Sequence, residues 1–225
     1  MATLISPLQE TDIPAYVRLE LEAFRTHPRI NMLWPRGYTD DLYAYYEERK
    51  LKSFHDKDCH IMKAVDDQTS EIMGVSEWDF HLDPEATVRS QRTDPNEQPP
   101  ANWPRSGNWE IRKFFVLEWE KWTRETFAGK PHIELHLLVV HPKFHRRGAG
   151  TKLLSWGCDQ ANKHGVAMCL ESTPAGMELY RRFGFREVRT LKADMRQFGW
   201  DQPYDEDAAK RVWMVRDVND HVHGR

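Results

Sequence analysis

The sequence predicts an α/β fold, and three features support this prediction. An apolar run from Ile133 to Val140, rich in Leu and Val, is typical of a strand buried in a sheet. A basic, glycine-rich loop follows this run and leads directly into a helical pattern from Lys152 to Lys163. Further strand-like and helical segments lie on both sides of this central stretch.

The central loop has the properties of an anion-binding site. A strand that ends at Pro142, passes through a loop with Gly148 and Gly150 and enters a helix leaves free backbone N–H groups at one point. A Walker loop does not fit, because Gly150 is followed by Thr151 and only then by a lysine. A dinucleotide fingerprint does not fit either, because Leu153 stands where the third glycine is required.

The loop resembles the acetyl-CoA loop of the GNAT family of N-acetyltransferases. That family has the pattern Arg/Gln-x-x-Gly-x-Gly/Ala after a strand that ends in Val-x-Pro. Here Val140–Pro142 precedes His145–Gly150, and His145 replaces the usual Arg or Gln. A second block, Tyr180–Phe185, matches the Tyr-x-x-x-Gly-Phe end of the family's late helix. The resemblance covers roughly residues 133–188.

The resemblance implies the fold in more detail. We expect a mixed, mostly antiparallel sheet of about seven strands, splayed between strands 4 and 5, with helices on both faces. A single domain is expected over residues 1–218, with an insertion at about 81–130. Residues 219–225 are expected to form a disordered tail.

Composition and charge narrow the function classes. The chain has 225 residues and a formal net charge of −3, so no overall basic field favours nucleic acid. Three cysteines lack metal-ligand or redox spacing, which is typical of reduced thiols in an intracellular protein. No targeting or membrane-spanning segment is predicted. We therefore expect a cytoplasmic monomer or homodimer.

The histidine spacing does not predict a metal site. The pairs His132/His136 and His141/His145 are four residues apart. One pair falls on a strand and the other on a proline-containing loop, where this spacing does not place two side chains on one face. We expect no bound metal.

The N-terminal third predicts two helices followed by two strands. A short strand over Leu4–Leu8 precedes a helix that begins after Thr11-Asp12, and Asp40 is expected to cap a second helix. The strands are expected at His60–Val65 and Ile72–Trp78. In the family, the connection between the first two helices lies over the acceptor site. The resemblance therefore makes Trp34 a candidate substrate contact.

The predicted insertion has two parts. Five prolines between His81 and Arg105 argue against regular structure there. Helical spacing returns over Trp109–Phe127. This helix either packs on the sheet edge or forms a lid or pocket wall with Trp109 as a substrate contact. The last two strands are expected at Val188–Met195 and Arg211–Val218, with a long loop between them.

The resemblance implies acetyl-CoA as the co-substrate. Backbone N–H groups of the glycine-rich loop would hold its pyrophosphate, and the main chain at the end of the splayed central strand would hold its pantetheine and acetyl carbonyl. The residues expected to contact it are Leu138, Val139, Val140, His145, Arg146, Arg147, Gly148, Ala149, Gly150, Thr151 and Ser172.

The central strand also carries candidate catalytic residues. Strand alternation places Glu134, His136, Leu138 and Val140 on one face, and ionisable groups on a buried strand are costly unless they are used or paired. Histone-type members of the family carry a catalytic glutamate at the position of Glu134. The arylalkylamine type, which the central strand resembles most, carries histidines at 134 and 136. Glu134 or His136, acting through water, is the expected base, and Tyr180 is the expected acid.

The resulting hypothesis is transfer of an acetyl group from acetyl-CoA to the primary amine of a small molecule. The tryptophans favour an apolar or aromatic amine. A protein acetyltransferase acting on a lysine or an N-terminal amine is one alternative, and would need an open acidic groove. An acyl-CoA-binding sensor without turnover is an alternative of another class.

Overall fold

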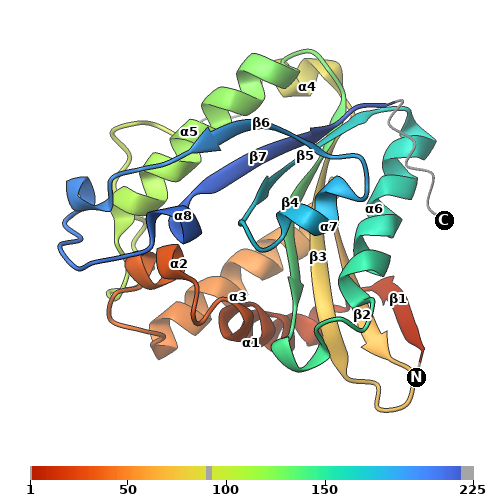
Figure 1. The fold of residues 1–225 in the computed structure, drawn as a ribbon, viewed down its shortest axis with the longest axis horizontal. Coiled ribbons are helices and arrows are strands. Elements are labelled where there is room, and N and C mark those ends of the chain that lie inside the picture. The colour runs from red at the N-terminus through yellow and green to blue at the C-terminus, as the bar shows by residue number, and fades with distance from the viewer. Residues whose placement is uncertain (1, 90–92, 219–225) are drawn as a thin grey trace.

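The computed structural model describes residues 2–89 and 93–218, which build a seven-stranded sheet between two layers of helices (Figure 1). The strand order is β1-β2-β3-β4-β5-β7-β6, and every neighbouring pair is antiparallel except β4 and β5. The predicted mixed, mostly antiparallel sheet is confirmed. The strands are β1 Thr3–Pro7, β2 Cys59–Asp66, β3 Ile72–His81, β4 His132–Val140, β5 Ala167–Ser172, β6 Arg186–Leu191 and β7 Arg211–Arg216.

Helices cover both faces of the sheet. Three of them, α1 (Ile13–Ala23), α3 (Asp40–His55) and α5 (Trp109–Phe127), pack on one face, whereas α6 (Ala149–His164) and α7 (Met177–Arg181) pack on the other. The shorter helices are α2 Pro28–Leu33, α4 Pro84–Arg89 and α8 Glu206–Ala209, and 3₁₀ turns lie at Glu10–Asp12, Pro142–Phe144 and Met195–Phe198. The predicted tail 219–225 lies outside the described residues.

Helix α6 lies close to the sheet because of a small residue. A Cβ atom at Gly157 would stand 2.1 Å from Cη2 of Trp78, a fully buried side chain of β3. The apolar stripe predicted for this helix is confirmed, since its members are buried against β3, β4 and β5. The indole of Trp78 therefore occupies space that only glycine on α6 leaves open.

Several predicted boundaries are wrong, and each has a local cause. The expected connection after the first helix contains α2, which begins with Pro28 in the first turn, where proline is tolerated. Similarly, α4 begins with Pro84, and the side chain of Asp83 accepts a hydrogen bond from the backbone N–H of Glu85. A further turn of helix, α8, lies in the expected loop before β7. Helix α3 has Thr39, not Asp40, as its N-cap.

Strand β4 differs from simple alternation because it contains a β-bulge. Glu77 pairs with Leu137 and Trp78 pairs with Leu135, so His136 has no partner of its own on β3. The expectation that one face carries residues 134, 136, 138 and 140 is therefore wrong. Beyond the bulge, Leu137 and Val139 pack on the α1 side, whereas residues 138 and 140 pack on the α6 side.

The same strand separates from its parallel neighbour. Pairing of β4 with β5 runs only from His132–Ala167 to Leu135–Leu170, although β4 continues to Val140. Residues 136–140 therefore have no strand partner on the β5 side within the described residues. The predicted splay lies at this point.

Candidate active site

A cavity of about 580 Å³ lies beside the splay, on the face covered by α1, α2 and α5. This volume is within the range typical of small-molecule sites. Ile111, Phe115 and Trp119 of α5 form part of its wall, so the insertion helix both packs on the sheet and encloses the cavity. Both interpretations offered for this helix therefore apply, since it packs on the sheet and also forms a wall of the cavity.

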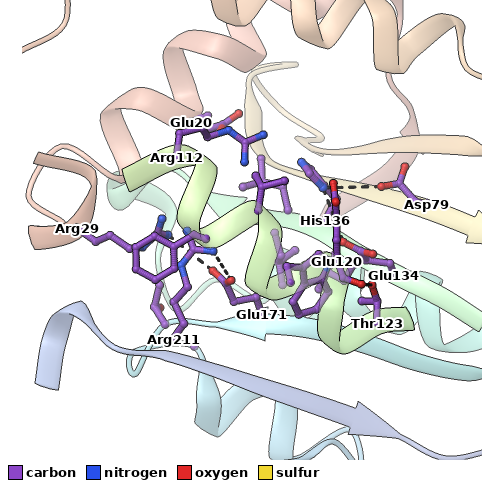
Figure 2. A pocket seen from close by; sticks show the side chains of 18 of the residues that line it. Glu20, Arg29, Asp79, Arg112, Glu120, Thr123, Glu134, His136, Glu171 and Arg211 are labelled. Carbon is purple, nitrogen blue, oxygen red and sulfur yellow. Dashed lines mark hydrogen bonds and ion pairs between the residues drawn. The ribbon is translucent and has the colours of Figure 1, made fainter. Parts of the chain in front are cut away.

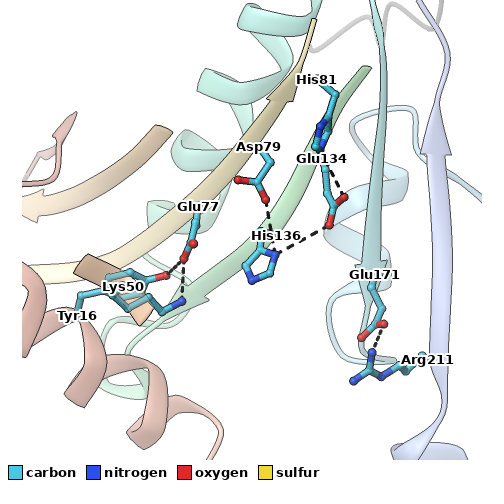
Figure 3. Close-up of polar contacts among 9 residues, drawn as sticks. All are labelled: Tyr16, Lys50, Glu77, Asp79, His81, Glu134, His136, Glu171 and Arg211. Atoms are coloured by element: carbon cyan, nitrogen blue, oxygen red, sulfur yellow. Dashed lines mark hydrogen bonds and ion pairs between the residues drawn. The ribbon is translucent and has the colours of Figure 1, made fainter. Parts of the chain in front are cut away.

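One end of the cavity gathers four ionisable side chains from β3 and β4 (Figures 2 and 3). Nδ1 of His136 lies 3.8 Å from a carboxylate oxygen of Asp79 and 4.0 Å from one of Glu134, while Nε2 of His81 lies 3.9 Å from the other oxygen of Glu134. The bulge turns His136 toward the two carboxylates. These distances exceed a direct hydrogen bond, so proton transfer between the groups requires a small shift or a bridging water.

The carboxyl group of Glu134 has an unusual acidity. Burial, and then the neighbouring charge of Asp79, raise the pKa of Glu134 to about 8. A base with a pKa near the working pH combines a useful deprotonated fraction with a useful proton affinity.

The same group of side chains could also hold a metal ion. Asp79, Glu134 and His136 offer ligand atoms within 4.8 Å of one another, a donor set that the sequence analysis did not bring together. The absence of a metal remains a prediction.

Tyr180 lies on α7 and reaches the same cavity from the side of the splay. Its ring is buried and packs edge-on against Phe185, with 6.0 Å between the ring centroids. Burial raises the pKa of Tyr180, which keeps its hydroxyl group protonated and able to donate.

The glycine-rich loop forms the entrance to α6. Arg146 and Gly148 both have positive φ, 63° and 83°, and Gly148 is the N-cap of the helix. The side chains of Arg146 and Arg147 are exposed, and the ring Nε2 of His145 lies 3.0 Å from the carbonyl oxygen of Val140 at the end of β4. The loop is thereby tied to the splayed strand, and the backbone N–H groups of the first turn of α6 point away from the helix.

The remaining predicted contacts occupy different places. Ser172 is buried at the end of β5, and its hydroxyl donates to the carbonyl oxygen of Thr173 at 2.7 Å. Trp34 is 3% exposed and packs in the core against Trp103, with 5.1 Å between the ring centroids. Trp109 packs against the same Trp103 and donates to a backbone carbonyl outside the cavity. Neither Trp34 nor Trp109 lines the cavity, because both complete the packing between α5 and the α2–α3 connection.

The other end of the cavity is rich in arginine (Figure 2). Two of these residues contact the ring of Phe115, with the guanidinium of Arg211 3.9 Å from the ring centroid and that of Arg29 5.6 Å from it. Glu171 of β5 forms an ion pair with Arg211 and lies 3.8 Å from Arg29. Arg112 of α5 lines the cavity at the same end.

Sequence analysis missed Asp79 and all of these arginines. A signal was present on α5, where Arg112, Phe115 and Trp119 share one face at helical spacing, so a cation falls within an apolar stripe. Arg29, Glu171 and Arg211 come from three separate elements, and no local pattern relates them.

The comparisons with known proteins agree with this geometry. Residues 111–187 match the family model described as an acetyltransferase (GNAT) domain. Over this segment the chain is similar to that family. No curated protein matches the chain.

Solved structures share the fold of this chain at low sequence identity. Arylalkylamine N-acetyltransferase 2 from Aedes aegypti is 15% identical, with a TM-score of 0.68 over 97% of this chain and 100% of that one. A structure described as histone acetyltransferase HPA2 and related acetyltransferase from Corynebacterium glutamicum is 21% identical, with a TM-score of 0.58 over 96% and 97%. The PaiA N-acetyltransferase from Thermoplasma acidophilum, in complex with coenzyme A, is 13% identical, with a TM-score of 0.51 over 96% and 99%.

In the part of the chain that the structure describes, none of the helices combines the length and hydrophobicity needed to cross a bilayer.

Proposed function

We propose that the chain transfers the acetyl group of acetyl-CoA to the primary amine of a small molecule. The observation that carries this proposal is the walled cavity of about 580 Å³, which joins the Glu134–His136 cluster to Tyr180 beside the splayed strand. A cavity of this size with α5 as one wall suits a small acceptor better than a segment of another protein. Similarity to a protein named arylalkylamine N-acetyltransferase supports the same class of acceptor.

The proposed reaction is a direct attack. The amine nitrogen forms a bond to the acetyl carbonyl carbon while the carbon–sulfur bond breaks. Glu134 or His136 accepts the ammonium proton through water, and the hydroxyl of Tyr180 supplies a proton to the leaving thiolate. Backbone groups of Leu138, Val139 and Val140, which lack a β5 partner, would hold the thioester and pantetheine.

The pyrophosphate of acetyl-CoA is proposed to bind at the start of α6. His145, Arg146, Arg147, Gly148, Ala149, Gly150 and Thr151 are the residues proposed for this contact, and Ser172 is proposed to lie beside the pantetheine. The positive φ values at 146 and 148 support this binding site, because they turn backbone N–H groups of the loop toward one point.

A cytoplasmic site of action is also part of the proposal, and the three free cysteines support it. The assembly would be a monomer or a homodimer.

The test measures CoA release from acetyl-CoA with a panel of primary amines, a lysine-containing peptide and no acceptor, together with calorimetry of acetyl-CoA binding. We expect amine-dependent CoA release, and a turnover roughly 10–100-fold lower for Tyr180→Phe because the leaving thiolate loses its proton donor. Acceptance of the peptide alone would indicate a protein acetyltransferase. Binding of acetyl-CoA without CoA release for any acceptor would indicate a sensor, and no binding at all would exclude both.

A further inference from the structure

The charges of the cavity are separated along its length (Figure 2). Asp79 and Glu134 lie at one end with His136, where the proposed reaction takes up a proton. Arg29, Arg112 and Arg211 lie at the other end. A ligand that fills the cavity therefore contacts an acidic region through one part and a basic region through another.

The basic end carries more positive charge than its own carboxylates neutralise. Glu171 is shared between Arg29 and Arg211. Glu20, the other carboxylate that lines this end, forms an ion pair with Lys50 at 3.0 Å. Among the described residues, Arg112 has no ion pair.

At least one guanidinium N–H donor at this end also has no hydrogen-bond partner. Nε of Arg211 is buried without a hydrogen-bond partner. Burial, and then repulsion by Arg49, lower the pKa of Arg112 to about 10, and burial, followed by repulsion from Arg29, lowers the pKa of Arg211 to about 9. Both groups remain charged at neutral pH. Cations held this close in a largely buried place are stabilised by an anion.

We infer, on the basis of the proposed N-acetyl transfer, that the acceptor carries a carboxylate as well as an amine, and that Arg112 with Arg29 and Arg211 binds this carboxylate. The planar fork of a guanidinium group matches the two oxygens of a carboxylate. The ammonium group of the same molecule then lies toward Asp79, Glu134 and His136. The acceptor class is thus an amino acid or a related zwitterion, rather than a purely cationic or aromatic amine.

The experiment compares amines in matched pairs that differ only in a carboxylate, with tyrosine and tyramine, arginine and agmatine, and histidine and histamine as the probes. For at least one pair, kcat/KM of the carboxylated member is expected to be about tenfold or more higher, since a charge-assisted hydrogen bond contributes on this scale. Arg112→Gln should lower that preference by about tenfold or more, and Arg112→Lys should lower it less. Lys121→Gln, an exposed change on the same helix, should preserve it.

Binding gives a readout that does not need turnover. The probe is 3-(4-hydroxyphenyl)propionate, which is tyrosine without its amine. It is titrated into wild-type protein and into Arg112→Gln with CoA present. We expect binding that weakens about tenfold in the variant. Preference for the carboxylate-free amines, or equal binding to both proteins, would overturn the inference. If no amine is acetylated, the proposed function fails, and this titration then decides the carboxylate site by itself.

Discussion

Glu134 is a largely buried carboxyl group beside a second carboxyl group, Asp79, and this pairing sets its chemistry. Two like charges in a site of low polarity do not ionise together easily. The proton that Glu134 holds at neutral pH is therefore released over a pH range in which an ordinary glutamate is already ionised. The nearby imidazole of His136 can share that proton.

If Glu134 is the base, kcat/KM should rise with pH through about 8, because only the carboxylate form accepts a proton. Glu134→Gln should lower kcat/KM by roughly 10²–10⁴-fold and remove this rise. Asp79→Asn should shift the rise to lower pH, because it removes the charge that opposes ionisation. The measurement is the pH profile of CoA release. An unchanged profile in Glu134→Gln would assign the base to His136.

The pH dependence of the free energy of unfolding is an independent test of the raised pKa of Glu134. The pKa of Glu134 is raised from the ordinary 4.5 to about 8 by folding. Between these values the folded state binds more protons than the unfolded state, so the free energy of unfolding falls as pH rises. Urea unfolding of the wild type and of Glu134→Gln at several pH values should show a smaller decline in the variant.

At the scale of elements, a buried ion network joins α1 and α3 to β3 (Figure 3). Nζ of Lys50 lies 2.7 Å from a carboxylate oxygen of Glu77 and 3.0 Å from one of Glu20, and the hydroxyl of Tyr16 donates to Glu77 at 2.6 Å. Burial alone would raise the pKa of Glu77, but Lys50, His136 and these hydrogen bonds hold it well below its usual range. The network fixes the helices above the strand that carries Asp79.

Lys50→Met should reduce the free energy of unfolding by about 3–5 kcal/mol, because it leaves two buried carboxylates without their cation. Denaturant unfolding with urea measures this change. The double variant Lys50→Met/Glu77→Gln should recover part of the loss. The wild-type contribution of Glu77 is present above its ordinary pKa of 4.5 and is lost as pH falls below it. A loss under 1 kcal/mol in Lys50→Met would contradict the role given to this network.

Helix α5 packs on the sheet and also lines the acceptor cavity. It is inserted between β3 and β4, and the side chain of its N-cap, Asn108, accepts from the backbone N–H of Ile111 at 3.2 Å. The helix presents Arg112 to the cavity. Trp119 and Trp122 of this helix pack against Trp213 of β7. This packing sets where the wall of the cavity lies.

At the scale of the whole molecule, one sheet carries both the proposed acetyl-CoA site and the proposed acceptor cavity. We expect residues 1–218 to unfold as one unit, in a single cooperative transition. A ligand that binds only the folded state stabilises it, so acetyl-CoA at 100 times its dissociation constant should raise the melting temperature by roughly 5–10 °C. Thermal unfolding followed by circular dichroism measures this shift. Two separate transitions would contradict the single unit, and no shift would contradict acetyl-CoA binding.

The sequence by itself determined the parts of the fold that depend on local patterns. The apolar run of β4, the helix spacing of Trp109–Phe127 and the glycine-rich entry to α6 each reflect backbone or packing requirements expressed within about 20 residues. Glu134, His136 and Tyr180 could be chosen as candidates because they lie in or beside these patterns. The structure brings all three to one cavity.

Only the tertiary structure decided what surrounds those candidates. The β-bulge at His136 depends on pairing with β3, and the arrangement of Arg29, Glu171 and Arg211 near Phe115 depends on contacts such as that of Arg29 with Glu171, residues that lie far apart in the chain. Trp34 and Trp109 were expected at the acceptor site for their aromatic surface, yet both pack against Trp103, Trp34 in the core and Trp109 half-buried beside it. Side-chain type limits what a residue can do, whereas long-range packing decides which other groups it meets.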